Sequence, residues 1–354
     1  MQLRAALGSS RDGGWKVAFA LSLCAAAFAA LALVVALIGS FDDPPPPAEA
    51  HSDVALADGS GVPAPSPTAT PSASATPVRT PTATRTPRPA RTVTPVQPFG
   101  RSLTLVEDPD LANAIEDALG DEADHFSVVV VRPSDGRAAL VDPDRVFYAA
   151  SLFKLAVLYE AGLRLSSGVI LLDDPLHLSD EELAEDLGTA DELELDEEGN
   201  LPLGDALEAM VTVSDNATAV ALLHLFGSYN VDLTLRALGI ETLSVNTREL
   251  PATARDVARL MDAIVAGEGL DAASHELLLG LLSRQTVRGG IPSGLPDDVL
   301  SGNKTGTWEH ITHDVAYVDA PSGTYIIAVL SDTDRDWDRI AEVSEAVYEA
   351  LAVR

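Results

Sequence analysis

An unbroken apolar run near the N-terminus is the longest hydrophobic feature of this 354-residue chain. It spans residues 17–38 and reads VAFALSLCAAAFAALALVVALI. A helix of this length crosses a hydrocarbon layer of ~30 Å. The apolar core of a signal peptide is shorter, on the order of 7–15 residues, and ends in small residues at a cleavage site. We therefore predict an uncleaved transmembrane helix over residues 17–38.

The charges that flank this run predict its orientation. Basic residues precede the run and acidic residues follow it, namely Arg4, Arg11 and Lys16 before it and Asp42 and Asp43 after it. Because cytoplasmic flanks carry the excess of Lys and Arg, residues 1–16 are expected in the cytoplasm. The chain is then a single-pass protein of the cell membrane, and everything after the helix is expected to be extracytoplasmic.

The pattern changes abruptly after the apolar run. Residues 42–98 are dominated by Pro, Thr, Ala and Ser, as in PTATPSASATPVRTPTATRTPRPARTVTP. Such a segment has too little apolar surface to offset its ordering entropy, and its prolines favour extended polyproline II. We predict a disordered linker that holds the following domain away from the bilayer.

Residues 99–354 show the periodicities of helices and of strands in turn. The predicted elements, in chain order, are a helix over 108–120, two strands joined by the turn Ser134-Asp135-Gly136, a long helical region from 151 to beyond 280, a second pair of strands that turn at Pro321-Ser322-Gly323, and a closing helix over 336–352. Strands at both ends with helices between them indicate one sheet assembled from distant parts of the chain. We therefore predict an α+β domain, an antiparallel sheet flanked by helices with a mostly helical lobe inserted.

The charge of this domain restricts its partners. The formal net charge of the chain is −31, and almost all of it comes from residues 99–354. Nucleic acid is excluded as a partner, because its recognition needs a concentrated basic surface. Residues 173–200 hold much of the acid, without the ordered D-x-D-x-D-G loop of a calcium site. We interpret this stretch as a solvated surface insertion.

Candidates for disulfide or metal chemistry are few. Cys24, the only cysteine, lies in the apolar run, which excludes an intramolecular disulfide. His310 and His313 lie near the start of the second strand pair without the cysteine or carboxylate partners of a zinc site. We interpret both as polar surface groups, with a substrate-lining role left open for His310, and we expect neither a metal nor a cofactor. Nothing in the pattern indicates an oligomeric state.

A lysine interrupts the apolar segment YAASLFKLAV, residues 148–157. Placing an ammonium group in a hydrophobic interior costs several kcal/mol unless something compensates it or takes its proton. If Ser151 begins a helix, Lys154 projects from the same face three residues later, so its amine can approach the serine hydroxyl. A desolvated lysine with a lowered pKa can activate a serine as a nucleophile. Alone, however, Ser-x-x-Lys is weak evidence, and a lysine that snorkels to solvent fits it as well.

Two further motifs change this assessment. Ser214-Asp215-Asn216 lies between apolar helical segments, and Lys304-Thr305-Gly306 leads into the second strand pair. Separately, the first could be a helix cap and the second a turn. Ser-x-x-Lys, Ser-Asp-Asn and Lys-Thr-Gly in this order are the signature of penicillin-recognising serine enzymes.

With these three motifs, residues from about 100 to 350 resemble the class A β-lactamase and penicillin-binding-protein superfamily of serine hydrolases. The resemblance implies that Ser151 is acylated by an amide or lactam carbonyl and that Lys154 is the general base or a proton relay. It further implies that Ser214 passes a proton to the leaving nitrogen and that Lys304 sets the electrostatics around Ser214. Asn216 would hold the substrate's side-chain amide, and the substrate-binding edge would consist of Thr305, Gly306 and Thr307. The backbone N–H groups of Ser151 and Thr307 would form the oxyanion hole. Asp215 is expected to hold its loop through backbone hydrogen bonds.

The chain departs from the class A pattern where that family carries its deacylating glutamate. Glu249 falls about where this glutamate would be, and it can equally be a solvent-exposed carboxylate beside Arg248. The loop is cut short directly after it, and Thr253 stands where the family's assisting asparagine is expected. Without a positioned water, acylation proceeds while hydrolysis of the acyl-enzyme lags.

These observations predict a membrane-anchored, extracytoplasmic serine hydrolase of the class A β-lactamase-like superfamily. It is expected to form an acyl-enzyme with a β-lactam or a peptidoglycan-type amide. Two alternatives stay open. One is a penicillin-binding D-Ala-D-Ala peptidase-like protein, and the other is a wall-binding or sensing module that is acylated without turnover.

Overall fold

The computed structural model describes residues 105–189 and 193–352. The predicted transmembrane helix over 17–38, the segment before it and the linker over 42–98 lie outside the described residues. Within the described ranges, every helix is too short or too polar to cross a membrane.

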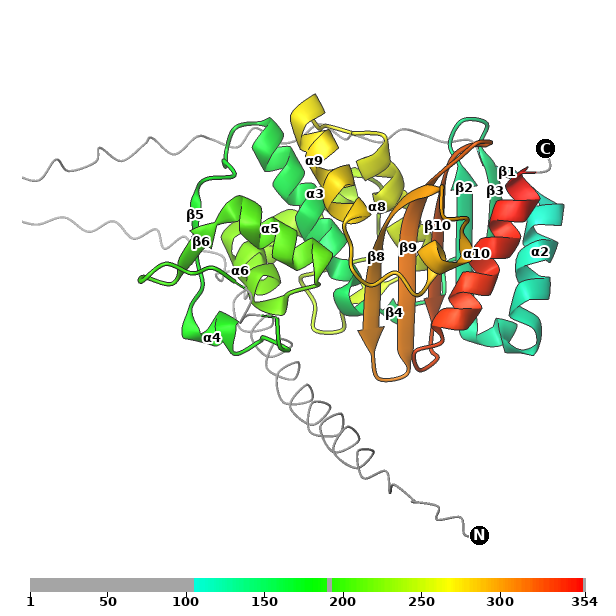
Figure 1. Ribbon diagram of the computed structural model, residues 1–354, viewed down its shortest axis with the longest axis horizontal. Coiled ribbons are helices and arrows are strands. Elements are labelled where there is room, and N and C mark those ends of the chain that lie inside the picture. The colour runs from blue at the N-terminus through cyan, green and yellow to red at the C-terminus, as the bar shows by residue number, and fades with distance from the viewer. Residues whose placement is uncertain (1–104, 190–192, 353–354) are drawn as a thin grey trace, which may run out of the picture. The chain divides into compact units, whose positions relative to one another are not determined.

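A six-stranded sheet is the centre of the described domain, and Figure 1 shows its strands with helices on both sides. Its strands are β1 (Val106–Glu107), β2 (Phe126–Arg132), β3 (Arg137–Val141), β8 (Leu300–Trp308), β9 (Ile311–Ala320) and β10 (Gly323–Ser331). Their order across the sheet is β1-β3-β2-β10-β9-β8. The short edge strand β1 runs parallel to β3, and all other neighbours are antiparallel. The α+β fold with a sheet flanked by helices is therefore confirmed.

Alternation along the central strands divides the interior into two cores. Val128 and Val130 pack into one core, whereas Val129 and Val131 pack into the other. Successive side chains of a strand point to opposite faces, so a strand covered on both faces needs apolar residues at every position. The VVVV run of β2 meets this requirement. Gly136 and Gly323 adopt φ values of 75° and 112° in the two predicted hairpin turns, a conformation that suits glycine.

Two helices from the ends of the domain cover one face of the sheet. They are α2 (Pro109–Leu119) and α10 (Trp337–Ala352), drawn in cyan and red in Figure 1. Asp108 caps α2 by accepting hydrogen bonds from the backbone N–H groups of Asp110 and Leu111. Leu111, Ile115 and Leu119 of α2 lie in the same core as Ile340, Val343 and Val347 of α10. Both predicted terminal helices are confirmed.

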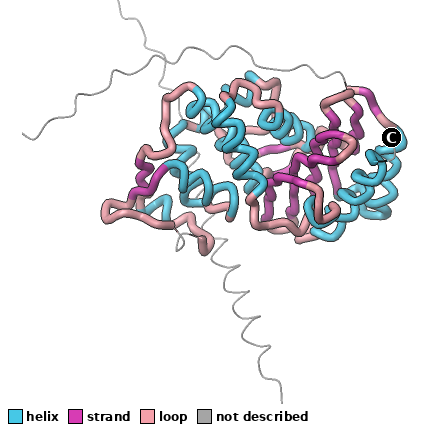
Figure 2. Tube along the Cα trace, turned by 45° about the horizontal axis from the view of Figure 1, so that its top comes forward, coloured by secondary structure: helices cyan, strands magenta, loops and turns pink. Residues whose placement is uncertain are grey.

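The other face of the sheet packs against α8 and the helical lobe (Figure 2). The helices here are α3 (Phe153–Ser166), α4 (Asp180–Leu183), α5 (Leu203–Thr212), α6 (Asn216–Phe226), α7 (Ser228–Ala237), α8 (Ala254–Val265) and α9 (Ala272–Ser283). Short 3₁₀ helices are η1 (Gly120–His125), η2 (Ala150–Leu152) and η4 (Ile291–Gly294). Two small antiparallel pairs join β4 (Phe147–Tyr148) to β7 (Pro251–Ala252) and β5 (Pro175–His177) to β6 (Asn200–Pro202).

The acidic stretch over 173–200 differs in part from its interpretation as a solvated insertion. Glu182 is buried at the start of α4, where it forms a capping box with Ser179 and contacts His224 at 2.9 Å. Glu185 is only 1% exposed, and its carboxylate oxygens have no hydrogen-bond partner among the described residues. Burial raises the pKa of Glu185 to about 7. Charge patterning missed the burial of Glu182, whose partner His224 lies 42 residues further along the chain.

Candidate active site

Ser151 lies in η2, directly before the first turn of α3. The residue before it, Ala150, has φ 45°, a left-handed conformation that is rare for residues with a Cβ. Ser151 is half-buried, and its hydroxyl has no hydrogen-bond partner within the described ranges. Lys154 is the second residue of α3 and is fully buried. The predicted helix start at Ser151 is thus present as a continuous 3₁₀ and α segment.

The Lys154 amine contacts the Ser-Asp-Asn loop rather than the Ser151 hydroxyl. Its Nζ donates to the Ser214 carbonyl oxygen at 2.5 Å and to Asn216 Oδ1 at 2.6 Å. The same Nζ lies 3.2 Å from Ser214 Oγ. Because α3 and this loop are far apart in sequence, these contacts bring the first two motifs together.

Ser214 and Asp215 form a tight connection between α5 and α6. Ser214 has φ 61°, a second left-handed residue in the site. Asp215 Oδ1 accepts hydrogen bonds from the Thr218 backbone N–H at 2.7 Å and from the Thr218 hydroxyl at 2.6 Å, and therefore caps α6. Its other oxygen accepts a hydrogen bond from the Thr189 hydroxyl at 2.6 Å. The expectation that Asp215 holds its loop is confirmed, with the side chain of Thr189 as an additional partner.

Lys304 of the Lys-Thr-Gly motif also contacts the Ser214 hydroxyl. It lies on β8, where its Nζ donates to Ser214 Oγ at 2.9 Å and to the Thr305 carbonyl oxygen at 3.0 Å. Lys304 is fully buried, as Lys154 is. Ser214 Oγ therefore lies between two buried amines, one from the helical lobe and one from the sheet.

Burial controls the protonation of both lysines. The pKa of Lys154 is lowered well below its ordinary value, first by burial and then by the nearby charge of Lys304, whereas Asp215 opposes the shift. The pKa of Lys304 is lowered to about 7 by burial, and Asp314 opposes this shift. A neutral Lys154 amine has two N–H donors and one lone pair. The Ser214 carbonyl and Asn216 Oδ1 occupy the two donors, so the lone pair is left for the third contact, the Ser214 hydroxyl at 3.2 Å.

Gly306 places the edge of β8 directly against the serine segment. A Cβ on Gly306 would lie 2.9 Å from the Ala149 carbonyl oxygen and 3.1 Å from Leu152 Cγ. Any side chain here would push apart β8 and the backbone that flanks Ser151. Of its neighbours, Thr305 is buried and Thr307 is exposed. The Lys-Thr-Gly strand and the Ser151 turn are therefore in direct contact.

Glu249 lies on the turn between Thr247 and Leu250 and is exposed. The next residue, Leu250, accepts a hydrogen bond from the Ala149 backbone N–H at 2.7 Å, which joins this turn to the serine segment. Thr253 caps α8 by accepting a hydrogen bond from the Asp256 N–H at 3.1 Å. The threonine at position 253 thus has a structural explanation, and the role of Glu249 stays a prediction.

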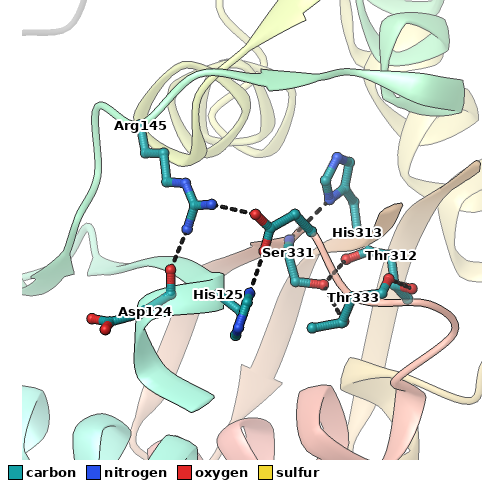
Figure 3. A network of polar contacts seen from close by, with 8 residues as sticks. Asp124, His125, Arg145, Thr312, His313, Ser331 and Thr333 are labelled. Carbon is teal, nitrogen blue, oxygen red and sulfur yellow. Dashed lines mark hydrogen bonds and ion pairs between the residues drawn. The ribbon is translucent and has the colours of Figure 1, made fainter. Parts of the chain in front are cut away.

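His313 does not lie on the surface, contrary to the prediction from sequence. It is fully buried on β9, and its ring contacts the Tyr148 carbonyl oxygen. The ring also contacts the Ser331 backbone N–H, as Figure 3 shows. His310 is exposed, as expected. The prediction for His313 was wrong because its covering partners come from β4 and β10, and nothing in its local sequence indicates them.

Asp314 and Asn303 form a second buried polar group that sequence reasoning missed. Asn303 Nδ2 donates to Asp314 Oδ1 at 2.9 Å, and the Ile291 N–H donates to Asp314 Oδ2 at 2.8 Å. Burial raises the pKa of Asp314 to about 7, against these hydrogen bonds and the nearby charge of Lys304. The strand of Lys304 is thus paired with one that carries a buried carboxyl group.

Comparison with known proteins identifies relatives with this architecture. The model of the β-lactamase enzyme family matches residues 110–351. A β-lactamase from Streptomyces albus G is 27% identical over 172 residues, which cover 43% of this chain and 55% of that protein. The chain thus matches about half the length of this curated relative.

Solved structures give the same result for the fold. PBP-A is 23% identical with a TM-score of 0.66, covering 72% of this chain and 100% of that one. A variant of the class A β-lactamase of the last common ancestor of Gram-negative bacteria is 26% identical with a TM-score of 0.60, covering 69% and 98%. Because the family match extends over most of the chain and nearly all of the described domain, this protein belongs to the β-lactamase enzyme family.

Proposed function

We propose that this protein is a serine hydrolase that forms an acyl-enzyme at Ser151 with a cyclic or linear amide. One observation carries the proposal, namely that two fully buried lysines converge on the single hydroxyl of Ser214. Within the described ranges neither amine forms an ion pair, although Asp215 and Asp314 oppose the two pKa shifts, and two desolvated amines are costly in a merely structural site. Their arrangement supports a proton-transfer role, because one amine is poised to be neutral while the other lies near its titration point.

The acylation step follows from these contacts. Ser151 Oγ attacks the substrate carbonyl carbon, and its proton passes to the neutral Lys154 amine. The proton then moves through Ser214 Oγ to the leaving nitrogen as the C–N bond breaks, which leaves an ester on Ser151. The backbone N–H groups of Ser151 and Thr307 are the proposed oxyanion hole. Charged Lys304 would favour the negative charge that develops in this step.

The proposed substrate is a β-lactam or a peptidoglycan stem-peptide amide. The family match supports this class, and a mutant of PBP-A has been solved as an acyl-enzyme complex with penicillin G, at 24% identity to this chain and a TM-score of 0.65. Thr305, Gly306 and Thr307 are the proposed edge for the substrate carboxylate. Asn216 would exchange its contact with Lys154 for the side-chain amide of the acyl group.

We propose that deacylation is the slow step. Glu249 is exposed on its turn, and no described residue holds it toward Ser151. General-base catalysis depends on placement before pKa. Glu249 remains the candidate base, and single-turnover decay of the acyl-enzyme decides its role. Slower decay in Glu249→Gln than in the wild type would assign it as the base, whereas equal decay would remove it from the catalytic set.

Turnover assays test the proposed function. We expect wild-type protein to hydrolyse a chromogenic cephalosporin or release D-Ala from a D-Ala-D-Ala peptide, with a burst of about one product per protein before a slow steady state. Ser151→Ala should abolish the burst. Ser167→Ala, at an exposed serine just after α3, is the matched control and should keep it. A burst that survives in Ser151→Ala would contradict the proposal.

We also propose that residues 17–38 anchor the domain in the membrane with residues 99–354 outside the cytoplasm. The support is the apolar run, the basic residues before it and the linker composition after it. Protease added to intact cells should remove the domain, and deletion of residues 17–38 should release it from the membrane fraction. A domain that resists protease in intact cells would contradict this placement.

A further inference from the structure

The two residues Tyr148 and Ala149, which come shortly before Ser151, contact one pair of neighbouring residues on β8 and β9 through their carbonyl groups. Gly306 of β8 and His313 of β9 are direct partners in the strand register. His313 Nε2 lies 3.0 Å from the Tyr148 carbonyl oxygen, and a Cβ on Gly306 would lie 2.9 Å from the Ala149 carbonyl oxygen. Consecutive carbonyl groups of the serine segment therefore face this pair.

The ring of His313 has one tautomer that fits its contacts. The Ser331 backbone N–H donates to Nδ1 at 3.1 Å, so Nδ1 carries the lone pair (Figure 3). Nε2 must then carry the proton and donate it to the Tyr148 carbonyl oxygen. Burial lowers the pKa of His313 to about 4, which keeps the ring neutral at physiological pH.

The segment held by His313 leads directly into strained backbone. Ala150 has φ 45°, a conformation that costs on the order of 1–3 kcal/mol and persists only where surrounding contacts over-determine it. Besides the β4–β7 ladder, the two residues before it are held by His313 at the Tyr148 carbonyl, by the Leu250 carbonyl at the Ala149 N–H (2.7 Å) and by the Leu152 N–H at the Ala149 carbonyl (3.0 Å). Only the first comes from a side chain.

The aromatic ring next to His313 is held from outside the site. Phe147 meets the His313 ring edge to face with centroids 5.5 Å apart, and the Arg145 guanidinium lies 4.7 Å from the Phe147 ring centre. Arg145 in turn donates to the Asp124 carbonyl oxygen and to Asp332, and the first of these contacts is drawn in Figure 3. His313 therefore acts from a packed position and not from a mobile surface.

We propose that His313 is a positioning residue for acylation. Its Nε2–H donates a hydrogen bond to the Tyr148 carbonyl and thereby fixes the strained backbone of Ala150 and Ser151. This backbone presents both the nucleophile and the oxyanion-hole N–H of Ser151. This inference rests on the proposed function of Ser151. His313 touches neither the substrate nor the reacting atoms in this arrangement, so its effect is expected on the acylation rate constant and not on noncovalent binding.

Two substitutions at one position separate positioning from packing. His313→Leu removes the donor, whereas His313→Gln keeps an N–H at the reach of Nε2. His275→Leu is the matched control, because His275 Nε2 also contacts a backbone carbonyl, that of Val265 at 3.0 Å, but joins α9 to the end of α8 and not to the serine segment. The acylation rate constant and the noncovalent dissociation constant are measured by stopped-flow with a fluorescent penicillin on full-length protein. Hydrogen exchange of residues 145–155 is measured on the same samples.

We expect His313→Leu to acylate ~10- to 100-fold more slowly, since a displaced oxyanion donor or nucleophile has effects of this order. The dissociation constant should change by less than about twofold, His313→Gln should recover most of the rate, and His275→Leu should match the wild type. Exchange at residues 148–152 should be faster in His313→Leu alone.

Three results would overturn the inference: a wild-type rate in His313→Leu, equal loss in Leu and Gln variants, or a loss carried by the dissociation constant. If wild-type protein neither takes up nor hydrolyses penicillin and releases no D-Ala from a D-Ala-D-Ala peptide, the proposed function fails, and the exchange data still decide the positioning claim. Unchanged exchange in His313→Leu would then overturn it.

Discussion

The Lys304 amine nitrogen lies 2.9 Å from the hydroxyl oxygen of Ser214. This contact joins the sheet to the helical lobe, because Lys304 comes from β8 and Ser214 from the loop between α5 and α6. The Lys154 amine approaches the same oxygen at 3.2 Å from a third element, α3. A hydroxyl between two buried amines is a short path for a proton, and the proposed acylation step uses this path.

Removing the Lys154 amine tests its role as a base. We expect Lys154→Met to lower the acylation rate constant by ~10²-fold or more, the usual effect of losing a general base. Met fills a similar volume but leaves the Ser214 carbonyl and Asn216 Oδ1 without this donor, which is expected to cost about 1–3 kcal/mol of stability. Stopped-flow acylation with a fluorescent penicillin gives the rate, and circular dichroism verifies the fold. A near-normal rate in a folded variant would show that Lys154 is only structural.

The titration of Lys304 predicts how the acylation rate falls at alkaline pH. Its pKa is lowered to about 7, so Lys304 is charged below this pH and neutral above it. If the charge aids acylation, the second-order acylation constant, which reports the free protein, should fall as the pH rises through about 7. Lys304→Arg stays charged and should retain its own rate up to pH 9. An alkaline limb at the same pH in both proteins would contradict this assignment.

The burial of Asp314 predicts a pH-dependent stability. Its folded pKa is raised to about 7 from an ordinary value of 3.8, so the folded state binds more protons than the unfolded state between these values. The contribution of Asp314 is fully present below about pH 4 and is lost as the pH rises to 7. Asp314→Asn removes this loss. In urea unfolding, the variant should gain about 1 kcal/mol or more relative to wild type between pH 5 and pH 8. Parallel curves would contradict the shift.

Alanine substitutions at two glycines distinguish a change in the active site from a loss of overall stability. Gly306→Ala places a Cβ 2.9 Å from the Ala149 carbonyl oxygen and should displace the Ser151 segment, lowering acylation ~10-fold or more. Gly294→Ala is the matched control, because its Cβ would lie 2.1 Å from the Ala341 carbonyl oxygen on α10. It should lower the melting temperature while the folded fraction acylates normally. Equal acylation in the Gly306→Ala variant and the wild type would show that contact with β8 does not position Ser151.

Elements with strong local signals were predictable from sequence. The VVVV run, the turn Ser134-Asp135-Gly136 and the capping residue Asp108 each specify local structure through neighbours within a few residues. The lysine in YAASLFKLAV was informative for the opposite reason, since its charge conflicts with its apolar surroundings. The edge strand β1 and the two small strand pairs were missed, because strands of two or three residues carry no periodic pattern.

The supporting contacts of the site were not predictable. Thr312, His313 and Asp314 resemble a polar surface stretch, yet all three are buried. Their partners are distant in sequence: Thr333, Tyr148, Ser331, Asn303 and Ile291. Alternation along β9 separates the faces of the sheet, but it cannot indicate that both faces are covered. Tertiary structure alone identifies these residues.

Intact-mass spectrometry with a penicillin shows whether Ser151 is acylated. Wild-type protein should gain the mass of one penicillin, and peptide mapping should assign the adduct to Ser151. Ser151→Ala should gain nothing, whereas Ser167→Ala should be labelled like the wild type. The absence of both adduct and hydrolysis in the wild type, or an adduct that persists in Ser151→Ala, would contradict the account.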